Sequence, residues 1–170
     1  MKAAPEEVQL VKDRLARSVK LRQRLAKKCD RLDALELQIS SLSSPRLDGM
    51  PRGGTPKHDR LADMIASKLD LEAQIREIRE QIRKDARQLA GLFEDLPPKQ
   101  ELVCCLRYVD GLSWPETIAA MYDGADDWED DPEKYQNITY KEHGKALASL
   151  ALIMKERGIL GKQEEGGDEE

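Results

Sequence analysis

A chain of 170 residues is long enough for one or two small domains with a modest core, which excludes a large multidomain enzyme. Charged residues make up 36% of the sequence and aromatic residues only 4%, a balance typical of exposed or paired helices and therefore of an all-α fold. The three cysteines, two of them adjacent, exclude a disulfide framework and a CxxC metal site, and they fit a reducing cytoplasm.

The net charge of −5 is distributed unevenly. Residues 1–58 carry 13 Lys and Arg against 7 Asp and Glu, whereas residues 96–170 carry 8 against 17. Most of these C-terminal acids lie between Asp123 and Glu133 and in the last ten residues. Because the field near a surface depends on charges within a Debye length of about 8 Å, the total charge does not indicate what the C-terminal part binds.

Two long helices are predicted, from about Pro5 to Leu42 and from about Asp59 to Phe93. Both carry apolar residues at heptad spacing, the pattern of a coiled-coil seam. Lys68 and Asp85 interrupt the seam of the second helix, where we expect them to fix its register. The apolar seam residues of the first helix are Leu21, Leu25, Leu32, Leu35, Ile39 and Leu42.

The segment between these helices, at about residues 43–58, is rich in Ser, Gly and Pro and cannot continue a helix. The simplest arrangement for residues 1–95 is therefore an antiparallel helical hairpin. Since neither helix can bury its apolar stripe alone, the two must pair with each other or with a second subunit.

A separate three-helix domain is predicted over residues 96–160, after the break at DLPPKQ. Its first helix, from about Lys99 to Val109, should present Leu102, among others, to the core. Ser113 and Glu116 form a capping box that begins the second helix.

The third helix has two candidate starts. Asp130 followed by Pro132 favours an early start, whereas Thr139 with Glu142 offers a second capping box. The helix should end at Gly158. An acidic insertion at about 123–133 precedes it, and the tail 161–170 is too charged to fold.

The run LPPKQELVCCLRYVDGLSWPETIAAMY resembles the fourth region of bacterial sigma factors and of related small phage regulators, which contains a helix-turn-helix. The matching residues are Leu96, Pro97, Leu106, Arg107, Tyr108, Gly111, Leu112, Ser113, Trp114, Glu116, Ile118 and Ala119. The following NITYKEHGKAL is similar to the phage recognition helix at Tyr140, His143, Gly144, Ala146 and Leu147.

A second segment, SPRLDGMPRGG, resembles a motif of phage late-gene transcription regulators similar to those called ArpU and RinA. These regulators join a helical N-terminal part to the sigma-like domain. The resemblance covers roughly residues 20–157. It departs from the family in the insertion GADDWEDDPE, which lengthens a short turn, and at Glu142, where the family has an apolar core residue.

The resemblance implies that the third helix lies in the major groove of double-stranded DNA. Gln136, Asn137, Tyr140 and Lys141 would then face the bases, and Lys145 would follow the backbone. Asn and Gln can read adenine, and Lys can reach the acceptors of guanine.

Other side chains of this domain keep more than one interpretation. Arg107 and Lys99 are weaker candidates for phosphate contacts, and an ion pair within the protein is as good an account of Arg107. Tyr140 could pack on its own helix. His143 could be structural or could face phosphate.

The acidic insertion has three interpretations. It could be a solvated loop, which costs little entropy. It could be a regulatory element that repels phosphates until a basic partner captures it. A calcium loop built on Asp127, Glu129 and Asp131 is disfavoured, because Pro132 replaces the required glycine and Ile138 the final Glu.

Catalytic and cofactor motifs are missing from the sequence. His58 and His143 belong to no metal-binding or triad pattern, and GMPRGG precedes no phosphate-binding GK[ST]. We expect a protein that is not an enzyme, with no metal and no cofactor. The longest apolar run, residues 146–154, is far shorter than the roughly 20 residues that span a bilayer.

The sequence therefore predicts a phage-encoded, DNA-binding transcription regulator in the cytoplasm of a bacterial host. Its expected partners are double-stranded DNA, bacterial RNA polymerase and a second copy bound through the hairpin. Two alternatives remain open. One is a sigma-like module that binds RNA polymerase without reading DNA, and the other is a small terminase-like adaptor for DNA packaging.

Overall fold

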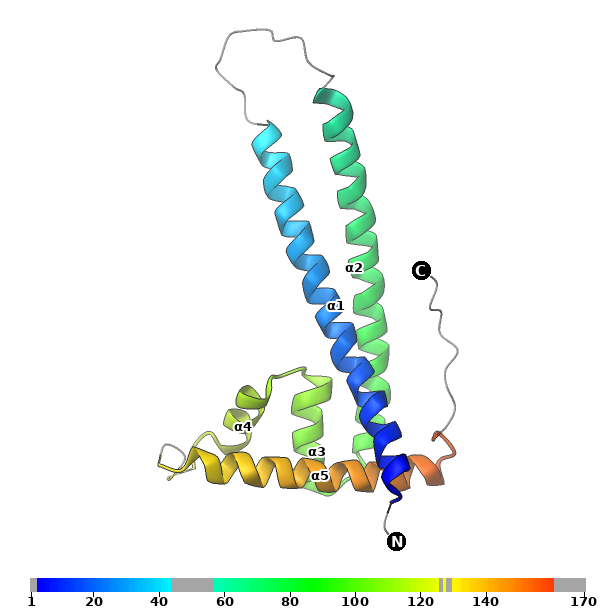
Figure 1. Ribbon diagram of the computed structural model, residues 1–170, viewed down its shortest axis with the longest axis vertical. Helices are drawn as coiled ribbons and strands as arrows, with labels where there is room; N and C mark the ends of the chain where they lie inside the picture. The colour runs from blue at the N-terminus through cyan, green and yellow to red at the C-terminus, as the bar shows by residue number, and fades with distance from the viewer. Residues whose placement is uncertain (1–2, 44–56, 126, 128–129, 161–170) are drawn as a thin grey trace. The chain divides into compact units, whose positions relative to one another are not determined.

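A computed structural model of the chain describes residues 3–43, 57–125, 127 and 130–160. No strand occurs in these ranges, so the prediction of an all-α fold is confirmed. The elements are α1 (Pro5–Ser43), α2 (Lys57–Phe93), α3 (Pro98–Cys104), η1 (Cys105–Val109), α4 (Trp114–Tyr122) and α5 (Pro132–Glu156) (Figure 1).

The chain divides into two compact units, and the division differs from the predicted boundary at residues 95 and 96. Residues 20–83 form one unit, here called the hairpin unit. The described residues of 1–19 and 84–170 form the other, here called the head unit. The start of α1 and the end of α2 thus belong with the C-terminal helices, because Val11, Leu15 and Leu89 are buried in the core of the head unit.

In the hairpin unit, the later part of α1 and the earlier part of α2 lie side by side and run in opposite directions (Figure 1). Lys28 Nζ donates to Gln74 Oε1 at 2.6 Å, and Lys68 Nζ lies 2.9 Å from Glu36 Oε1. Lys68, which interrupts the apolar seam, is therefore neutralised by the opposite helix. The predicted linker at about 43–58 lies almost entirely outside the described residues.

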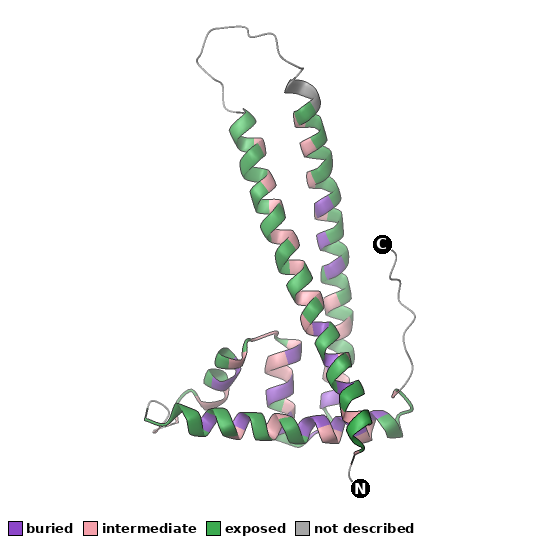
Figure 2. Cartoon of the chain, viewed as in Figure 1, coloured by how far each residue is buried: buried purple, intermediate pink, exposed green. Residues whose placement is uncertain are grey.

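The buried side of the hairpin unit is concentrated on α2. Leu71, Ile75 and Ile78 are buried, whereas the seam leucines of α1 are only half-buried and Leu42 is exposed (Figure 2). Aliphatic side chains at heptad spacing thus form the seam, and α2 contributes the better-covered half of it.

The core of the head unit gathers residues from both ends of the chain. The buried members are Val11, Leu15, Leu89, Leu92, Phe93, Leu96, Val103, Cys104, Tyr108, Ala146, Leu147, Leu150, Ala151 and Met154. Asp85, the second polar residue in the predicted seam, accepts a hydrogen bond from Arg14 Nη2 at 2.5 Å. This ion pair joins α1 to α2 at the edge of the core.

The first helix of the C-terminal part changes its winding at Cys105. α3 continues into η1, a π-helical turn in which the N–H of Asp110 donates to the carbonyl of Cys105 at 2.9 Å. Gly111, with a φ of 77°, then turns the chain away. The expectation that Leu102 is a core residue was wrong: it is 44% exposed, because Val103 and Cys104 occupy the inner side of the helix.

The capping box predicted for α4 is present. The backbone N–H of Ser113 donates to Glu116 Oε2 at 2.7 Å, and the N–H of Glu116 donates to Ser113 Oγ at 3.4 Å. Two amide groups that the helix leaves without internal partners are satisfied in this way.

The early start of α5 is the observed one. The side chain of Asp131 accepts from the N–H of Lys134 at 3.1 Å and caps the helix. Thr139 cannot be a cap, because it is fully buried and its hydroxyl donates to the carbonyl of Tyr135 at 2.8 Å. At the other end Gly158 has a φ of 66°, and the N–H of Ile159 returns to the carbonyl of Met154 at 2.9 Å, as in a Schellman motif.

Candidate nucleic-acid interface

One side of α5 is anchored in the head unit. α5 packs most extensively on α3 and also contacts α4 (Figure 1). Its anchoring residues are buried along the whole length of the helix: Tyr135, Thr139, Ala146, Leu147, Leu150, Ala151 and Met154. Because a helix has a fixed period, burial of this side leaves the opposite side exposed.

A chain of aromatic rings fixes the rotation of α5 about its own axis. The ring of Trp114, at the start of α4, makes edge contacts with Tyr140 and His143, with centroids 5.0 and 4.9 Å apart. Tyr108 lies 5.9 Å from His143 and 6.5 Å from Phe93, which is buried. This row of aromatic rings extends from the core to the surface, so a rotation of α5 would break several ring contacts at once.

His143 serves the core. Its Nε2 lies 2.9 Å from the hydroxyl of Tyr108. Burial and the nearby Arg107 guanidinium lower the pKa of His143 to about 4, and burial raises the pKa of Tyr108 to about 12. Both groups are therefore neutral at pH 7 and share one hydrogen bond. Of the two roles considered for His143, the structure supports the structural one.

Arg107 is also occupied within the protein. Its guanidinium lies 5.3 Å from the centroid of the Trp114 ring, and Nη1 donates to the carbonyl of Leu112 at 2.7 Å. The expected alternative was an ion pair, but the observed contacts are a cation–π contact and a carbonyl. Arg107 thus holds the connection before α4. Lys99 is exposed, and its charge helps to lower the pKa of Glu142 on α5.

The predicted DNA-reading residues are all exposed on α5. Gln136, Asn137, Lys141 and Lys145 are all exposed, and Tyr140 is 41% exposed. Gln136 Nε2 donates to the Tyr140 hydroxyl at 3.3 Å, which orients both side chains. These five exposed residues of α5 are here called the α5 face.

Two lysines of the α5 face differ in their surroundings. Lys145 Nζ lies 2.6 Å from Glu142 Oε1, and this hydrogen bond lowers the pKa of Glu142. Glu142, which stands where the family has an apolar residue, is consequently paired, and its burial does not leave a lone charge. Within the described residues Lys141 forms no ion pair, so its charge is available to a ligand.

The described part of the acidic insertion folds back on the start of α5. Asp127 accepts hydrogen bonds from Lys134 Nζ, at 2.6 Å, and from the hydroxyl of Tyr135. The first of these bonds is the main cause of the lowered pKa of Asp127. The backbone N–H groups of Asp130 and Asp131 turn back to the carbonyl of Asp127. An insertion carboxylate thereby neutralises a lysine at the N-terminal end of α5.

The calcium-loop interpretation receives no support from the described residues. Glu129 lies outside them, and they contain no group of three His, Cys, Asp or Glu side chains placed to hold a metal. Asp127 is already bound to Lys134 and Tyr135.

Gly144 is a feature of the α5 face that the sequence reasoning treated only as a family match. It lies in the interior of α5 and is exposed. A Cβ atom added there would meet no atom within 4 Å. No neighbour within the described protein therefore requires a glycine, although glycine destabilises a helix interior by roughly 1 kcal/mol relative to alanine.

The comparisons with known proteins are negative: no family model, curated protein or solved structure matches the chain significantly. Among the described residues, no helix combines the length and the apolar character that crossing a bilayer requires.

Proposed function

We propose that the protein is a DNA-binding transcription regulator of phage type that reads double-stranded DNA with the α5 face. The observation that carries the proposal is the grouping of Gln136, Asn137, Tyr140 and Lys141 on one exposed side of a helix whose other side is anchored in a core. A rigid helix with long polar side chains suits the major groove, which admits one α-helix.

The side chains of this face have complementary roles in the proposal. The amides of Gln136 and Asn137 can each pair with the edge of adenine, and the ammonium of Lys141 with the acceptors of guanine. Lys145 and Lys99 would contact phosphates, which adds affinity without sequence preference. The capping box at Ser113 and the ring of Trp114 hold α4 behind the reading helix.

The test is selection of bound duplexes from a random-sequence pool by the full chain, followed by affinity measurements with Lys141→Ala. A lost base contact of this kind costs about 1–3 kcal/mol, so the variant should bind the selected site roughly 5- to 150-fold more weakly. Lys27→Ala is the matched control, because it removes the same charge from an exposed position of the hairpin unit.

Two outcomes would contradict the proposal. If no sequence is enriched, or if Lys141→Ala and Lys27→Ala weaken binding equally, the α5 face does not read bases. Enrichment of no sequence together with binding to bacterial RNA polymerase would instead favour the polymerase-binding module. Assembly into a ring would favour the packaging adaptor.

We also propose that the regulator self-associates through the hairpin unit. Leu37, on α1, is 73% exposed and Leu69, on α2, is 58% exposed, so each of the two paired helices carries an uncovered leucine. A second copy would cover these side chains.

A further inference from the structure

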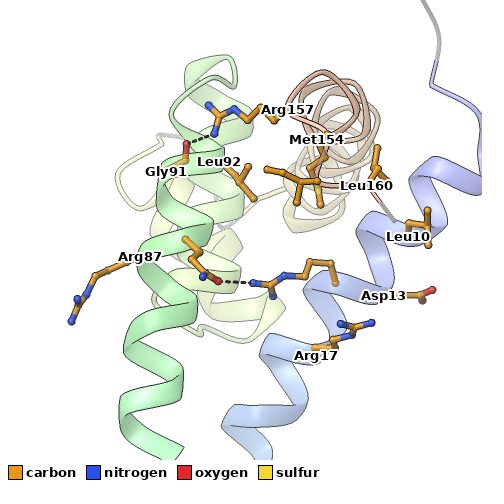
Figure 3. A pocket seen from close by; sticks show the side chains of 13 residues that line it. Leu10, Asp13, Arg17, Arg87, Gly91, Leu92, Met154, Arg157 and Leu160 are labelled. Atoms are coloured by element: carbon orange, nitrogen blue, oxygen red, sulfur yellow. Dashed lines mark hydrogen bonds between the residues drawn. The ribbon is translucent and has the colours of Figure 1, made fainter. Parts of the chain in front are cut away.

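A cleft of about 690 Å³ lies in the head unit, away from the α5 face. Its walls come from the start of α1, the end of α2 and the last turn of α5 (Figure 3). It falls within the range of about 300–1,000 Å³ that is usual for ligand sites. Nothing in the proposed function uses this cleft.

The inner wall of the cleft is apolar. Leu92 and Met154, both buried, point toward one another there (Figure 3). Leu160, the last residue that the structure describes, also lines the cleft. Gly91, in α2, leaves open space at its Cβ position, because a Cβ atom added there would meet no atom within 4 Å. At this residue the wall can therefore accept a peptide backbone at close range.

The rim of the cleft is cationic. Arg14, Arg17, Arg87 and Arg157 all line it, against one acid, Asp13. Arg14 is engaged by Asp85 at 2.5 Å, and Arg157 donates to the carbonyl of Gly91 at 3.3 Å and pairs with Asp95.

Two of these arginines are left uncompensated. In the described part of the chain, neither Arg17 nor Arg87 forms an ion pair, and both are exposed. Figure 3 shows Arg17 on α1 and Arg87 on α2, with the guanidinium of Arg87 directed away from the cleft. The edge of the cleft thus carries two exposed arginines without ion pairs, and long arginine side chains next to an apolar wall suit a chain segment with several carboxylates.

We propose that the cleft is the docking site of the chain's own acidic tail, residues 161–170, whose carboxylates pair with Arg17 and Arg87. The tail, GKQEEGGDEE, begins directly after Leu160 and carries five carboxylates against one lysine. Four extended residues span about 13 Å, which is the largest distance that can separate Glu164 from Leu160 in the cleft wall. Because the tail is covalently joined to the cleft wall by only a few residues, its effective concentration there is of about the millimolar order.

The contact is mainly electrostatic, so it should depend on salt. The Debye length falls from about 10 Å at 0.1 M salt to about 3 Å at 1 M. Docking should thus be strong at low salt and weak at high salt.

The test is the rate at which an arginine-specific dicarbonyl reagent, phenylglyoxal, modifies each arginine, mapped by mass spectrometry. The full chain is compared with a full-length variant whose tail is neutral, carrying Glu164→Gln, Glu165→Gln, Asp168→Asn, Glu169→Gln and Glu170→Gln. At low salt Arg17 and Arg87 should react about 3- to 10-fold more slowly in the natural chain, because carboxylates cover them. The difference should vanish at 1 M salt.

Arg24 is the internal control, since it is exposed and lies in the hairpin unit. Its rate should be the same in both chains. A synthetic peptide of residues 161–170, added at millimolar concentration to the neutral-tail chain, should restore protection of Arg17 and Arg87. Equal rates in the two chains, or equal slowing of Arg24, would overturn the proposal.

Discussion

The hydrogen bond between Tyr108 and His143 ties the stability of the head unit to pH. Burial keeps the pKa of His143 near 4, against an ordinary value of 6.5. Between these values the unfolded chain binds a proton that the folded chain does not, so stability is full above pH 6.5 and is lost as the pH falls toward 4. Because the His143 ring is only partly buried, solvent screening reduces its contribution to the free energy of unfolding to about 2 kcal/mol.

We expect His143→Gln, which retains a hydrogen-bonding side chain without titrating, to flatten this dependence. Urea unfolding of both proteins at several pH values between 6.5 and 4 measures it. Carboxylates that titrate in the same range contribute equally to the two proteins. If the free energy of unfolding depends on pH equally in both proteins, His143 is not the titrating group.

Gly144 gives a second prediction at the scale of one residue. Gly144→Ala should raise the free energy of unfolding by about 1 kcal/mol, because alanine is the better helix former and the new methyl group meets no atom. If a DNA backbone approaches α5 here, the same methyl group should weaken DNA binding.

Gly91→Ala is the matched control, since Gly91 also lies within a helix and also has open space around it. The Gly91→Ala variant should gain about as much stability as Gly144→Ala, and it should bind DNA with the affinity of the natural chain. Stability and affinity are measured by thermal unfolding and by titration of a selected duplex. Undiminished DNA binding by Gly144→Ala would place the DNA elsewhere.

The acidic insertion is the element that we expect to change the affinity for DNA. Asp127 neutralises Lys134 at the start of α5. We expect Asp127→Asn to release this ammonium, which raises DNA affinity at low salt and steepens the slope of log K against log salt by about 1, since one more phosphate is neutralised. Asp30→Asn, a change of the same charge on the exposed surface of α1, should leave the slope unaltered. Equal effects of both variants would mean that the insertion acts only through net charge.

Element boundaries could be predicted where the signal is local. Ser113 and Glu116 are three residues apart and cap α4 as expected. Thr139 and Glu142 have the same spacing, yet Thr139 is buried within α5. The spacing of a capping box indicates only that a segment can begin a helix by itself. Whether α5 begins at Asp131 or at Thr139 depends on packing against the rest of the head unit.

The candidate site was predictable only in part. The family resemblance indicated all five residues of the α5 face, and all five are exposed on α5. It did not indicate the contacts behind them, in which Trp114 touches both Tyr140 and His143. Nor did it indicate the π-helical turn at Cys105. The ring contacts of Trp114 join side chains far apart in the sequence, which a motif does not relate.

At the scale of the whole molecule, heptad spacing predicted long paired helices but not where their partners change. Val11 lies in heptad register with Leu25 and Leu32 of the helical seam, yet it is buried in the head unit. Leu71 and Ile75 are buried in the hairpin unit. An apolar stripe shows which side of a helix is covered, and it does not show what covers it.

Self-association through the hairpin unit is the prediction for the whole molecule. The natural chain should be a dimer by light scattering, and Leu37→Lys with Leu69→Lys should make it a monomer, because two charges would have to be desolvated at the interface. Leu102→Lys, at an exposed leucine of the head unit, should remain a dimer. A monomeric natural chain would remove the hairpin unit from consideration as an interface.

The core of the head unit also constrains how the protein is made. Val11 leaves the ribosome more than a hundred residues before Leu150 and Met154, with which it shares that core. At about 5–20 residues per second, the nascent chain carries an uncovered apolar N-terminus for roughly 10 seconds. Both arms of the hairpin unit are synthesised in the course of this interval and can pair before it ends. The rate of translation therefore determines how long the apolar residues of the first helix remain accessible to chaperones and to aggregation with other chains.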